Sequence, residues 1–249
     1  MKRPLIFLSL AALSLSACGY SVFDAAEDMQ GGDSGFADGK SITASSQTAA
    51  DFTKLEALGP DNIVFVTGDS FSIKAQGDAE AIAKLRYKVE DGTIMIGRER
   101  GKYWGKDNKG VTITVTAPAL VEASLAGSGD FNADKMAGEK VVLEIAGSGN
   151  LSVADVTGKS LESSVAGSGD VVLGGKVDRA EYSVAGSGNI DAVKLASTEV
   201  EVSIAGSGDV KLTASGKVDA SIAGSGNVEV AGGAKCTSST MGSGTISCS

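Results

Sequence analysis

One short string, Ala-Gly-Ser-Gly, recurs at an almost constant interval and constrains the fold more than any other feature of the sequence. It begins at six positions: Ala126, Ala146, Ala166, Ala185, Ala205 and Ala223. Met241-Gly242-Ser243-Gly244 is a seventh, altered copy, and the steps between copies are 20, 20, 19, 20, 18 and 18 residues. A period near 20 residues indicates a solenoid in which each repeat is one structural unit stacked on the next.

Apolar residues occupy fixed columns in these repeats. One column precedes the alanine: Leu125, Ile145, Val165, Val184, Ile204, Ile222 and Thr240. A second stands two places after the last glycine of Gly-Ser-Gly: Phe131, Leu151, Val171, Ile190, Val210, Val228 and Ile246. A third lies two places further: Ala133, Val153, Leu173, Ala192, Leu212, Val230 and Cys248. The two-residue step between the last two columns is strand spacing with one buried face, and Val and Ile favour strands. We therefore predict an all-β fold, a parallel β-helix of rungs of about 20 residues with an irregular N-terminal β portion.

Each Gly-Ser-Gly is predicted to form a corner, because glycine tolerates positive φ and close approach of stacked backbones. The residue after each corner alternates between acid and amide: Asp130, Asn150, Asp170, Asn189, Asp209 and Asn227. We interpret them as a structural ladder in which each asparagine separates two mutually repelling aspartates and donates hydrogen bonds to both. The alternative is calcium binding, but a calcium β-roll needs nine-residue repeats, so no metal is predicted.

Composition narrows the classes of function. The 34 glycines and 5% aromatic residues favour a narrow core lined by small side chains. The net charge is −9 and becomes −11 if Lys2 and Arg3 are removed, which argues against nucleic acid as a partner. Histidine is absent, so the commonest general base and metal ligand is missing. We predict no enzyme activity, no catalytic residue and no cofactor.

The N-terminus is predicted to direct export. Residues 1–17 read as a signal peptide, with a charged start and an apolar run too short to span a membrane. Leu15-Ser16-Ala17-Cys18 resembles the bacterial lipobox, in which Cys18 is lipidated; the alternative is ordinary cleavage near Ala17. Gly19 stands where an inner-membrane retention signal would have aspartate, so the resemblance implies the outer membrane.

The rest of the chain is expected to comprise a flexible tether and one domain. Residues 18–50 are rich in Gly, Ser, Ala and Asp, which is typical of a tether. Residues 51–249 form the β-helix domain, with regular repeats from about 121. Cys236 and Cys248 both fall in interior columns of the last repeat, and export to an oxidising compartment predicts a disulfide between them. Two buried free thiols are the alternative.

A cationic, aromatic segment interrupts this acidic chain between two strand-like runs. It contains Arg98, Arg100, Lys102, Tyr103, Trp104 and Lys106. Aromatic residues beside arginine are typical of an interaction hot spot or a sugar-stacking site, so the segment is a candidate binding loop. The alternative is a loop folded over the end of the coil, with Trp104 as a plug.

Residues 51–249 resemble the head GIN domain family, described as autotransporter adhesins. The resemblance rests on Asp91-Gly92 as a hairpin turn, on the strand Val111–Thr116 and on Ala117-Pro118-Ala119-Leu120 leading into the first Gly-Ser-Gly. It implies a right-handed β-helix at the cell surface without catalytic residues. The sequence has no C-terminal stretch suited to a translocator barrel, and a lipid anchor takes its place.

We therefore predict a non-enzymatic cell-envelope lipoprotein that adheres to or scaffolds other molecules. Its expected partners are the membrane, through the anchor, and a glycan or a surface protein. Two alternatives remain: a polysaccharide-active β-helix enzyme, whose acids would lie near Arg98–Lys106, and a purely structural envelope protein.

Overall fold

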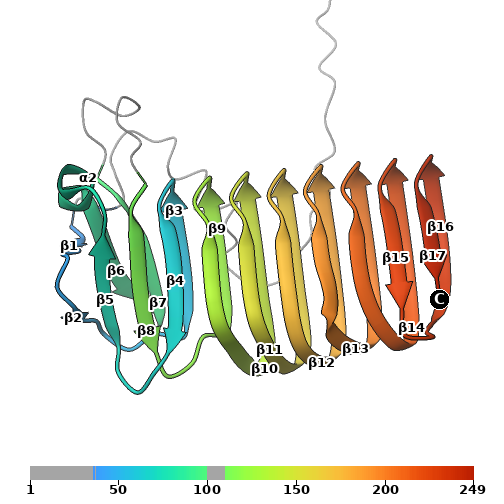
Figure 1. Ribbon diagram of the computed structural model, residues 1–249, viewed down its shortest axis with the longest axis horizontal. Coiled ribbons are helices and arrows are strands. Elements are labelled where there is room, and N and C mark those ends of the chain that lie inside the picture. Colours follow the sequence, from blue (N-terminus) through green and yellow to red (C-terminus); the bar gives the residue numbers. More distant parts are fainter. Residues whose placement is uncertain (1–35, 37, 100–109) are drawn as a thin grey trace, which may run out of the picture.

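The chain folds into a parallel β-solenoid of about six turns (Figure 1), which confirms the predicted fold class. The structure, a computed structural model, describes residues 36, 38–99 and 110–249. The elements are β1 (Lys40–Ser41), β2 (Gln47–Thr48), β3 (Lys54–Gly59), β4 (Asn62–Thr67), β5 (Ser72–Gln76), α2 (Ala79–Ala83), β6 (Leu85–Glu90), β7 (Thr93–Arg98), β8 (Thr112–Ala117), β9 (Glu122–Gly127), β10 (Phe131–Gly147), β11 (Leu151–Gly167), β12 (Val171–Gly186), β13 (Ile190–Gly206), β14 (Val210–Gly224), β15 (Asn227–Ala231), β16 (Lys235–Gly242) and β17 (Thr245–Cys248).

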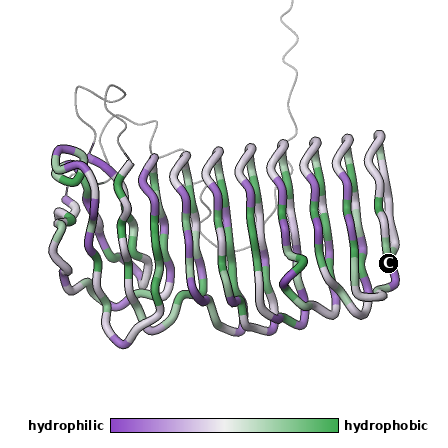
Figure 2. The backbone as a smooth tube through the Cα atoms, viewed as in Figure 1, coloured by the Kyte–Doolittle hydropathy of each residue, from purple (hydrophilic) through white to green (hydrophobic). Residues whose placement is uncertain are grey.

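The strands from β10 to β14 are the regular rungs, each paired in parallel with the next. The register places like residues on top of one another, so that Leu151 faces Val171 and Val165 faces Val184. The apolar columns up to the penultimate rung are buried and form one continuous core. Figure 2 shows the resulting alternation of apolar and polar residues along each rung. The periodicity of the sequence thus becomes a set of interior ladders.

The corners explain the Gly-Ser-Gly strings. The first glycine of each has positive φ, for example 133° at Gly186 and 140° at Gly206. At the second glycine, a Cβ on Gly208 would lie 2.0 Å from the carbonyl oxygen of Gly188 in the preceding rung. Serine between them continues the ladder, with Ser207 N donating to Gly186 O at 2.8 Å. The predicted role of the glycines as corners is confirmed.

Differences in rung length are absorbed away from these corners. The register shifts lie in the first half or the middle of the long strands, between Val153 and Val156, Val172 and Gly174, Ala192 and Ala196, and Ser197 and Glu199. The register through the alanine and the first glycine stays unbroken from β9 to β16. The constant corners therefore hold the coil in alignment while its other bends vary.

The N-terminal portion is threaded out of sequence order. Strand β3 pairs in parallel with β9 on one side and with β7 on the other, and β4 likewise lies between β10 and β8. The chain therefore makes one rung from β3 and β4, steps back to make the preceding rung from β7 and β8, and then crosses to β9. Antiparallel strands β5 and β6 cover this end, and the predicted turn at Asp91-Gly92 joins β6 to β7 with positive φ at both residues.

The predicted tether extends too far along the chain. Residues 38–50 belong to the domain, because β1 pairs with β6 and β2 pairs with β5. Ile42 and Ala49 are buried in the core. These two residues were not recognised in the sequence because the Gly- and Ser-rich stretch around them has no apolar periodicity. In the part of the chain that the structure describes, no helix has the length and apolar character needed to span a membrane.

Two buried hydroxyls face each other's rungs inside the regular core. Tyr182 is fully buried between Ser163 in the preceding rung and Val202 in the next. Neither its hydroxyl nor that of Ser163 has a hydrogen-bond partner among the described residues. Burial raises the pKa of Tyr182, so the phenol stays protonated at neutral pH.

Tyr182→Phe is expected to raise the free energy of unfolding by about 1 kcal/mol. The change removes an unpartnered buried hydroxyl, whose desolvation costs about 1–3 kcal/mol, and keeps the ring that fills the core. Urea unfolding of the two proteins measures the difference. A less stable variant would mean that the hydroxyl makes a stabilising bond in solution.

Candidate functional site

The Asp/Asn ladder runs along the corner edge of the coil. Each asparagine of the regular rungs donates twice to the aspartate below it: Asn150 N and Nδ2 lie 3.1 and 2.9 Å from Asp130 Oδ1. The same pair of bonds joins Asn189 to Asp170 and Asn227 to Asp209. Each carboxylate is thereby held by a backbone and a side-chain donor from the rung above.

The bonds toward the next rung have the opposite sense. Asn150 Oδ1 accepts the backbone N–H of Asp170 at 3.1 Å, and Asn189 Oδ1 accepts that of Asp209 at 3.0 Å. The expectation that each asparagine donates to both neighbouring aspartates is therefore wrong. The amide nitrogen serves one aspartate and the amide oxygen serves the backbone of the other, because the side chains all lean the same way along the coil axis.

The ladder begins one rung earlier than the repeats indicate. Asn62 Oδ1 accepts the backbone N–H of Asp130 at 2.9 Å, although the two residues are 68 apart in the chain. Gly59-Pro60-Asp61-Asn62 occupies the corner, with Gly59 in register with Gly127. The string lacks the second glycine of Gly-Ser-Gly, so pattern matching missed it. The features of the sequence that mark this corner are the first glycine, Gly59, and the Asx residue three places later, Asn62.

Asn189→Asp is expected to lower the free energy of unfolding by about 1–2 kcal/mol, and by more at low salt. The variant loses the Nδ2 donor to Asp170 and places a third carboxylate between Asp170 and Asp209. Protonating that carboxyl restores a donor, so the deficit shrinks as the pH falls toward about 4.

Asn132→Asp is the matched control for this change, because Asn132 is exposed on β10 outside the ladder. Denaturant unfolding at two salt concentrations measures both variants. Equal losses in the two proteins would show that the ladder has no special electrostatic role. Calcium is expected to rescue neither variant.

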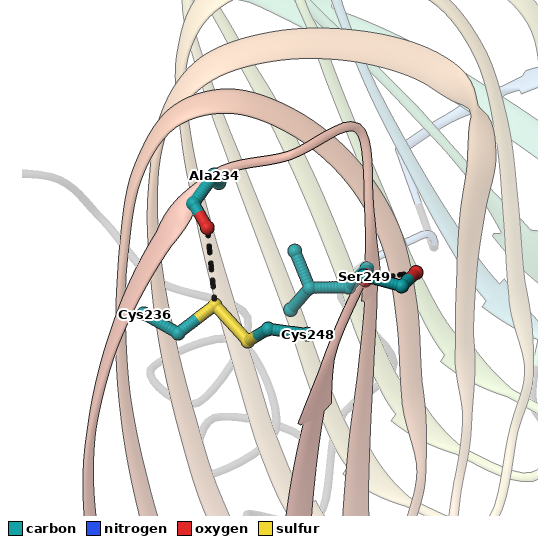
Figure 3. Close-up of a disulfide and its surroundings, with 5 residues drawn as sticks. Ala234, Cys236, Cys248 and Ser249 are labelled. Atoms are coloured by element: carbon teal, nitrogen blue, oxygen red, sulfur yellow. Dashed lines mark hydrogen bonds between the residues drawn. A yellow bond between two sulfur atoms is a disulfide. The ribbon is translucent and has the colours of Figure 1, made fainter.

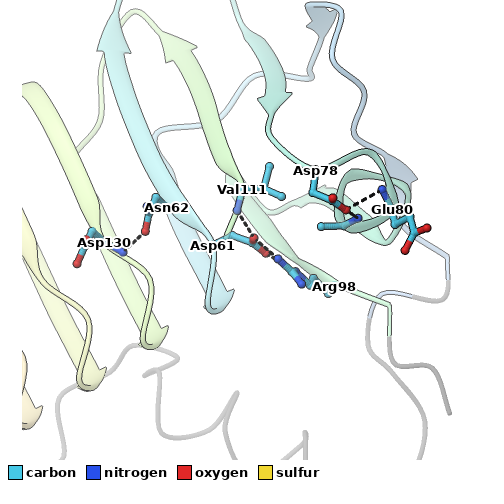
Figure 4. A network of polar contacts seen from close by, with 8 residues as sticks. Asp61, Asn62, Asp78, Glu80, Arg98, Val111 and Asp130 are labelled. Atoms are coloured by element: carbon cyan, nitrogen blue, oxygen red, sulfur yellow. Dashed lines mark hydrogen bonds and ion pairs between the residues drawn. The ribbon is translucent and has the colours of Figure 1, made fainter. Parts of the chain in front are cut away.

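Arg98 is not part of an exposed binding loop, which corrects the sequence prediction. Its guanidinium is buried and contacts Asp61 with two nitrogens, Nε lying 2.7 Å from Oδ2 and Nη2 lying 2.5 Å from Oδ1 (Figure 4). Asp61 Oδ1 also accepts the backbone N–H of Val111 at 3.0 Å. Hydrogen bonding to Asp61 raises the pKa of Arg98 against the opposing effect of burial.

This ion pair closes the corner of the first rung in space. Because β7 and β8 pair with β3 and β4, Arg98 at the end of β7 and Val111 just before β8 lie beside the corner that follows β3. Asp61 in that corner contacts both of them, through the guanidinium of Arg98 and the backbone N–H of Val111. The other predicted loop residues, Arg100, Lys102, Tyr103, Trp104 and Lys106, lie outside the described residues, as does the predicted lipidation site Cys18.

One wall of the coil presents a regular array of outward side chains. It consists of the second halves of β10–β14, and we call it the Glu-Ser-Ala wall. Its columns are acidic (Glu162, Glu181, Glu201 and Asp219), hydroxyl (Ser164, Ser183, Ser203 and Ser221) and small apolar (Ala146, Ala166, Ala185, Ala205 and Ala223).

The acids at the two ends of this wall are paired and those in its middle are not. Lys140 lies 2.6 Å from Glu162, and Lys217 lies 2.6 Å from Asp219. Glu181 and Glu201 are exposed and form no ion pair with a described residue. Partial desolvation of the carboxyl, followed by the charges of Glu162 and Glu201, raises the pKa of Glu181, while the charges of Lys140 and Arg179 oppose the shift. The middle of the wall therefore carries two carboxylates available to a partner.

A second acidic group lies at the N-terminal end of the same face. Glu56 on β3 is in register with Ser124, and Ser124 with Glu144. Burial, with the charges of Glu122 and Glu144, raises the pKa of Glu56, while Lys88 opposes the shift. One buried oxygen of Glu56 has no hydrogen-bond partner in the described part. Among residues 36, 38–99 and 110–249, no cluster of three acidic, cysteine or histidine side chains is arranged to hold a metal ion.

Fold and surface together define a class of protein. Its corners are short and its core is continuous, so the surfaces available for binding are the long, repetitive outer walls. Other solenoid proteins bind their partners on surfaces of this kind. The chain belongs to the family described as "Putative auto-transporter adhesin, head GIN domain", whose sequence profile matches residues 51–234. The predicted family membership is confirmed.

Solved structures share this architecture. A putative adhesin from Bacteroides fragilis is 26% identical, with a TM-score of 0.73 over 84% of this chain and 100% of that one. A protein from Parabacteroides distasonis described as a putative lipid binding protein is 28% identical, with a TM-score of 0.66 and the same coverage. A putative adhesin from Parabacteroides merdae, 21% identical with a TM-score of 0.63 over 82% of this chain and 95% of that one, shares the fold. Among curated proteins, none matches this sequence.

Proposed function

We propose that the protein is a non-enzymatic, adhesin-type binding module of the cell envelope, anchored in the outer membrane through Cys18, and that the Glu-Ser-Ala wall binds a glycan. Family membership supports an adhesin-like role at the cell surface or outside the cell. The anchor rests on the lipobox-like sequence that ends at Cys18.

The observation that carries the proposal is the order of the three columns on one wall. Carboxylates and hydroxyls can hydrogen-bond to sugar hydroxyl groups, and the alanine column beside them suits the apolar C–H faces of sugar rings. The columns run along the coil axis with one position per rung, at about 4.8 Å spacing. A linear chain lying along the axis would meet the same groups repeatedly, so weak contacts add up.

The double variant Glu181→Gln/Glu201→Gln tests this proposal on a glycan array. Neutral amides remove two unpaired carboxylates and relieve repulsion in the acidic column, so the fold is expected to persist while glycan binding falls at least about tenfold. Asp69→Asn/Asp178→Asn is the matched control, because it makes the same charge change at exposed positions outside the wall. Equal binding by both variants would contradict the assignment of this wall. Binding to surface proteins but to no glycan would overturn the ligand class.

The anchor has a separate test. Cys18→Ser is expected to move the protein from the membrane fraction of the producing bacterium to the soluble periplasmic or secreted fraction, because the acyl chains that would attach at Cys18 are lost. Unchanged partitioning after detergent extraction would refute lipidation and leave the binding proposal standing.

A polysaccharide-cleaving enzyme is the second candidate, and Glu56 is the observation that favours it. A carboxyl of raised pKa beside other carboxylates is typical of a general acid. Release of new reducing ends from envelope polysaccharides by the wild type, and its loss in Glu56→Gln, would establish this activity in place of simple binding. We expect no such release.

A further inference from the structure

The last rung places fewer apolar side chains toward the core than the rung below it. Ser238 stands in register with Ala220, and Thr240 with Ile222, so two hydroxyls replace buried apolar side chains. Both residues are exposed, as is most of β16 and β17. Only Ala234, Cys236 and Ile246 of this rung pack against the core. Apolar burial therefore holds the last rung less strongly than the rungs below it.

The rung beneath it is strongly apolar. Val218, Ile222, Val228 and Val230 of β14 and β15 are at most 3% exposed. They are covered by β16 and β17, which pair with β14 and β15 respectively and have no described strand on their other side. The last rung is thus a polar cap over an apolar layer, and its loss would uncover both that layer and a free parallel edge.

A disulfide closes this cap. Cys236 on β16 and Cys248 on β17 are joined across a Cα–Cα distance of 6.6 Å and a separation of 12 residues (Figure 3). The bond connects the two strands of the rung on different walls of the coil, so neither strand can leave while the other stays. Cys248 is exposed and Cys236 is half-buried, so solvent reaches the bond.

We propose that the Cys236–Cys248 disulfide is a reduction-sensitive clasp, and that a dithiol releases the last rung while the rest of the coil stays folded. A thiolate of the dithiol attacks the sulfur of Cys248, and the Cys236 thiolate leaves. The second dithiol sulfur then displaces Cys248, so the dithiol becomes a disulfide and its two protons end on Cys236 and Cys248. Two electrons pass from the dithiol to the protein.

Hydrogen exchange of the full chain, with and without dithiothreitol as the dithiol, tests the clasp. Reduction is expected to speed exchange in residues 235–249 on the order of a hundredfold, the effect of losing a loop closure of this length. Residues 151–206 are expected to keep their protection, because their apolar columns and corners do not depend on the bond.

The double variant Cys236→Ser/Cys248→Ser is expected to show the same fast exchange without reductant, and dithiothreitol is expected to change nothing further. This variant retains Cys18, the third cysteine of the chain, so it separates the effect of the clasp from any effect of dithiothreitol at Cys18. Unchanged exchange of residues 235–249 in the reduced wild type would overturn the proposal. Loss of protection throughout the coil would also overturn it, because the bond would then support the whole fold.

Discussion

Gly206→Ala is expected to abolish cooperative folding of the coil, with a loss of more than about 4 kcal/mol in the free energy of unfolding. The new Cβ would lie 2.0 Å from the carbonyl oxygen of Gly186, a backbone atom held by the preceding rung. The φ of 140° at Gly206 is also unfavourable for any residue with a side chain. Neither rung can move away, since both belong to the same ladder. Far-ultraviolet circular dichroism with urea titration measures the effect.

Gly110→Ala is the control for this substitution. A Cβ there would lie 3.9 Å from the carbonyl oxygen of Pro60, which is an ordinary contact. Ser207→Ala, at the exposed middle of the same corner, tests whether any change in the string is harmful. Both are expected to stay within about 0.5 kcal/mol of the wild type. A folded Gly206→Ala protein with an unchanged transition would show that the corners do not need glycine.

Asp61→Ala is expected to lower the free energy of unfolding by about 3–5 kcal/mol, because it removes the carboxylate that two nitrogens of the buried Arg98 guanidinium contact. The side chains of Arg98 and Asp61 are only 7% and 6% exposed, so water cannot replace the lost carboxylate. The backbone N–H of Val111 loses its acceptor in the same step. Thermal or urea unfolding measures the loss, and hydrogen exchange is expected to place it in β7 and β8.

Two further variants identify the cause. Glu99→Gln breaks the exposed ion pair with Arg86 at the end of the same hairpin and is expected to cost less than about 1 kcal/mol. Asp61→Leu/Arg98→Met removes both charges and is expected to recover most of the stability. If the double variant were as unstable as Asp61→Ala, the loss would come from the bond to Val111 rather than from the missing carboxylate beside Arg98.

The regular part of the coil could be predicted because its register repeats its sequence. Once copies stack at a fixed interval, residues such as Val165 and Val184 must face each other, and the alternation of Asp170 and Asn189 becomes a contact between neighbours. The pairing of Cys236 with Cys248 follows from the same columns. The direction of the hydrogen bonds could not be predicted, since it depends on how the Asx side chains lean along the axis.

The N-terminal portion could not be predicted because its neighbours in space are remote in the chain and unlike in sequence. Arg98 sits beside aromatic and cationic residues in the sequence, which suggested an exposed loop. Its position is set instead by Asp61, which lies 37 residues away and belongs to a corner without the repeated string. Ile42 was missed for a similar reason, because a single apolar residue carries no periodicity.

The out-of-order threading of β3 limits where a domain of this design can change its length. From β10 onward, a unit such as residues 190–209 could be duplicated or deleted, and the glycine corners on either side would still meet in register. Each such event changes the length of the coil by about 4.8 Å. Between β3 and β9 no separable unit exists, because partners 68 residues apart enclose everything between them. Duplication or deletion of repeats can therefore change the length of the domain only on the side of its disulfide-closed end, and it does so in steps of one rung.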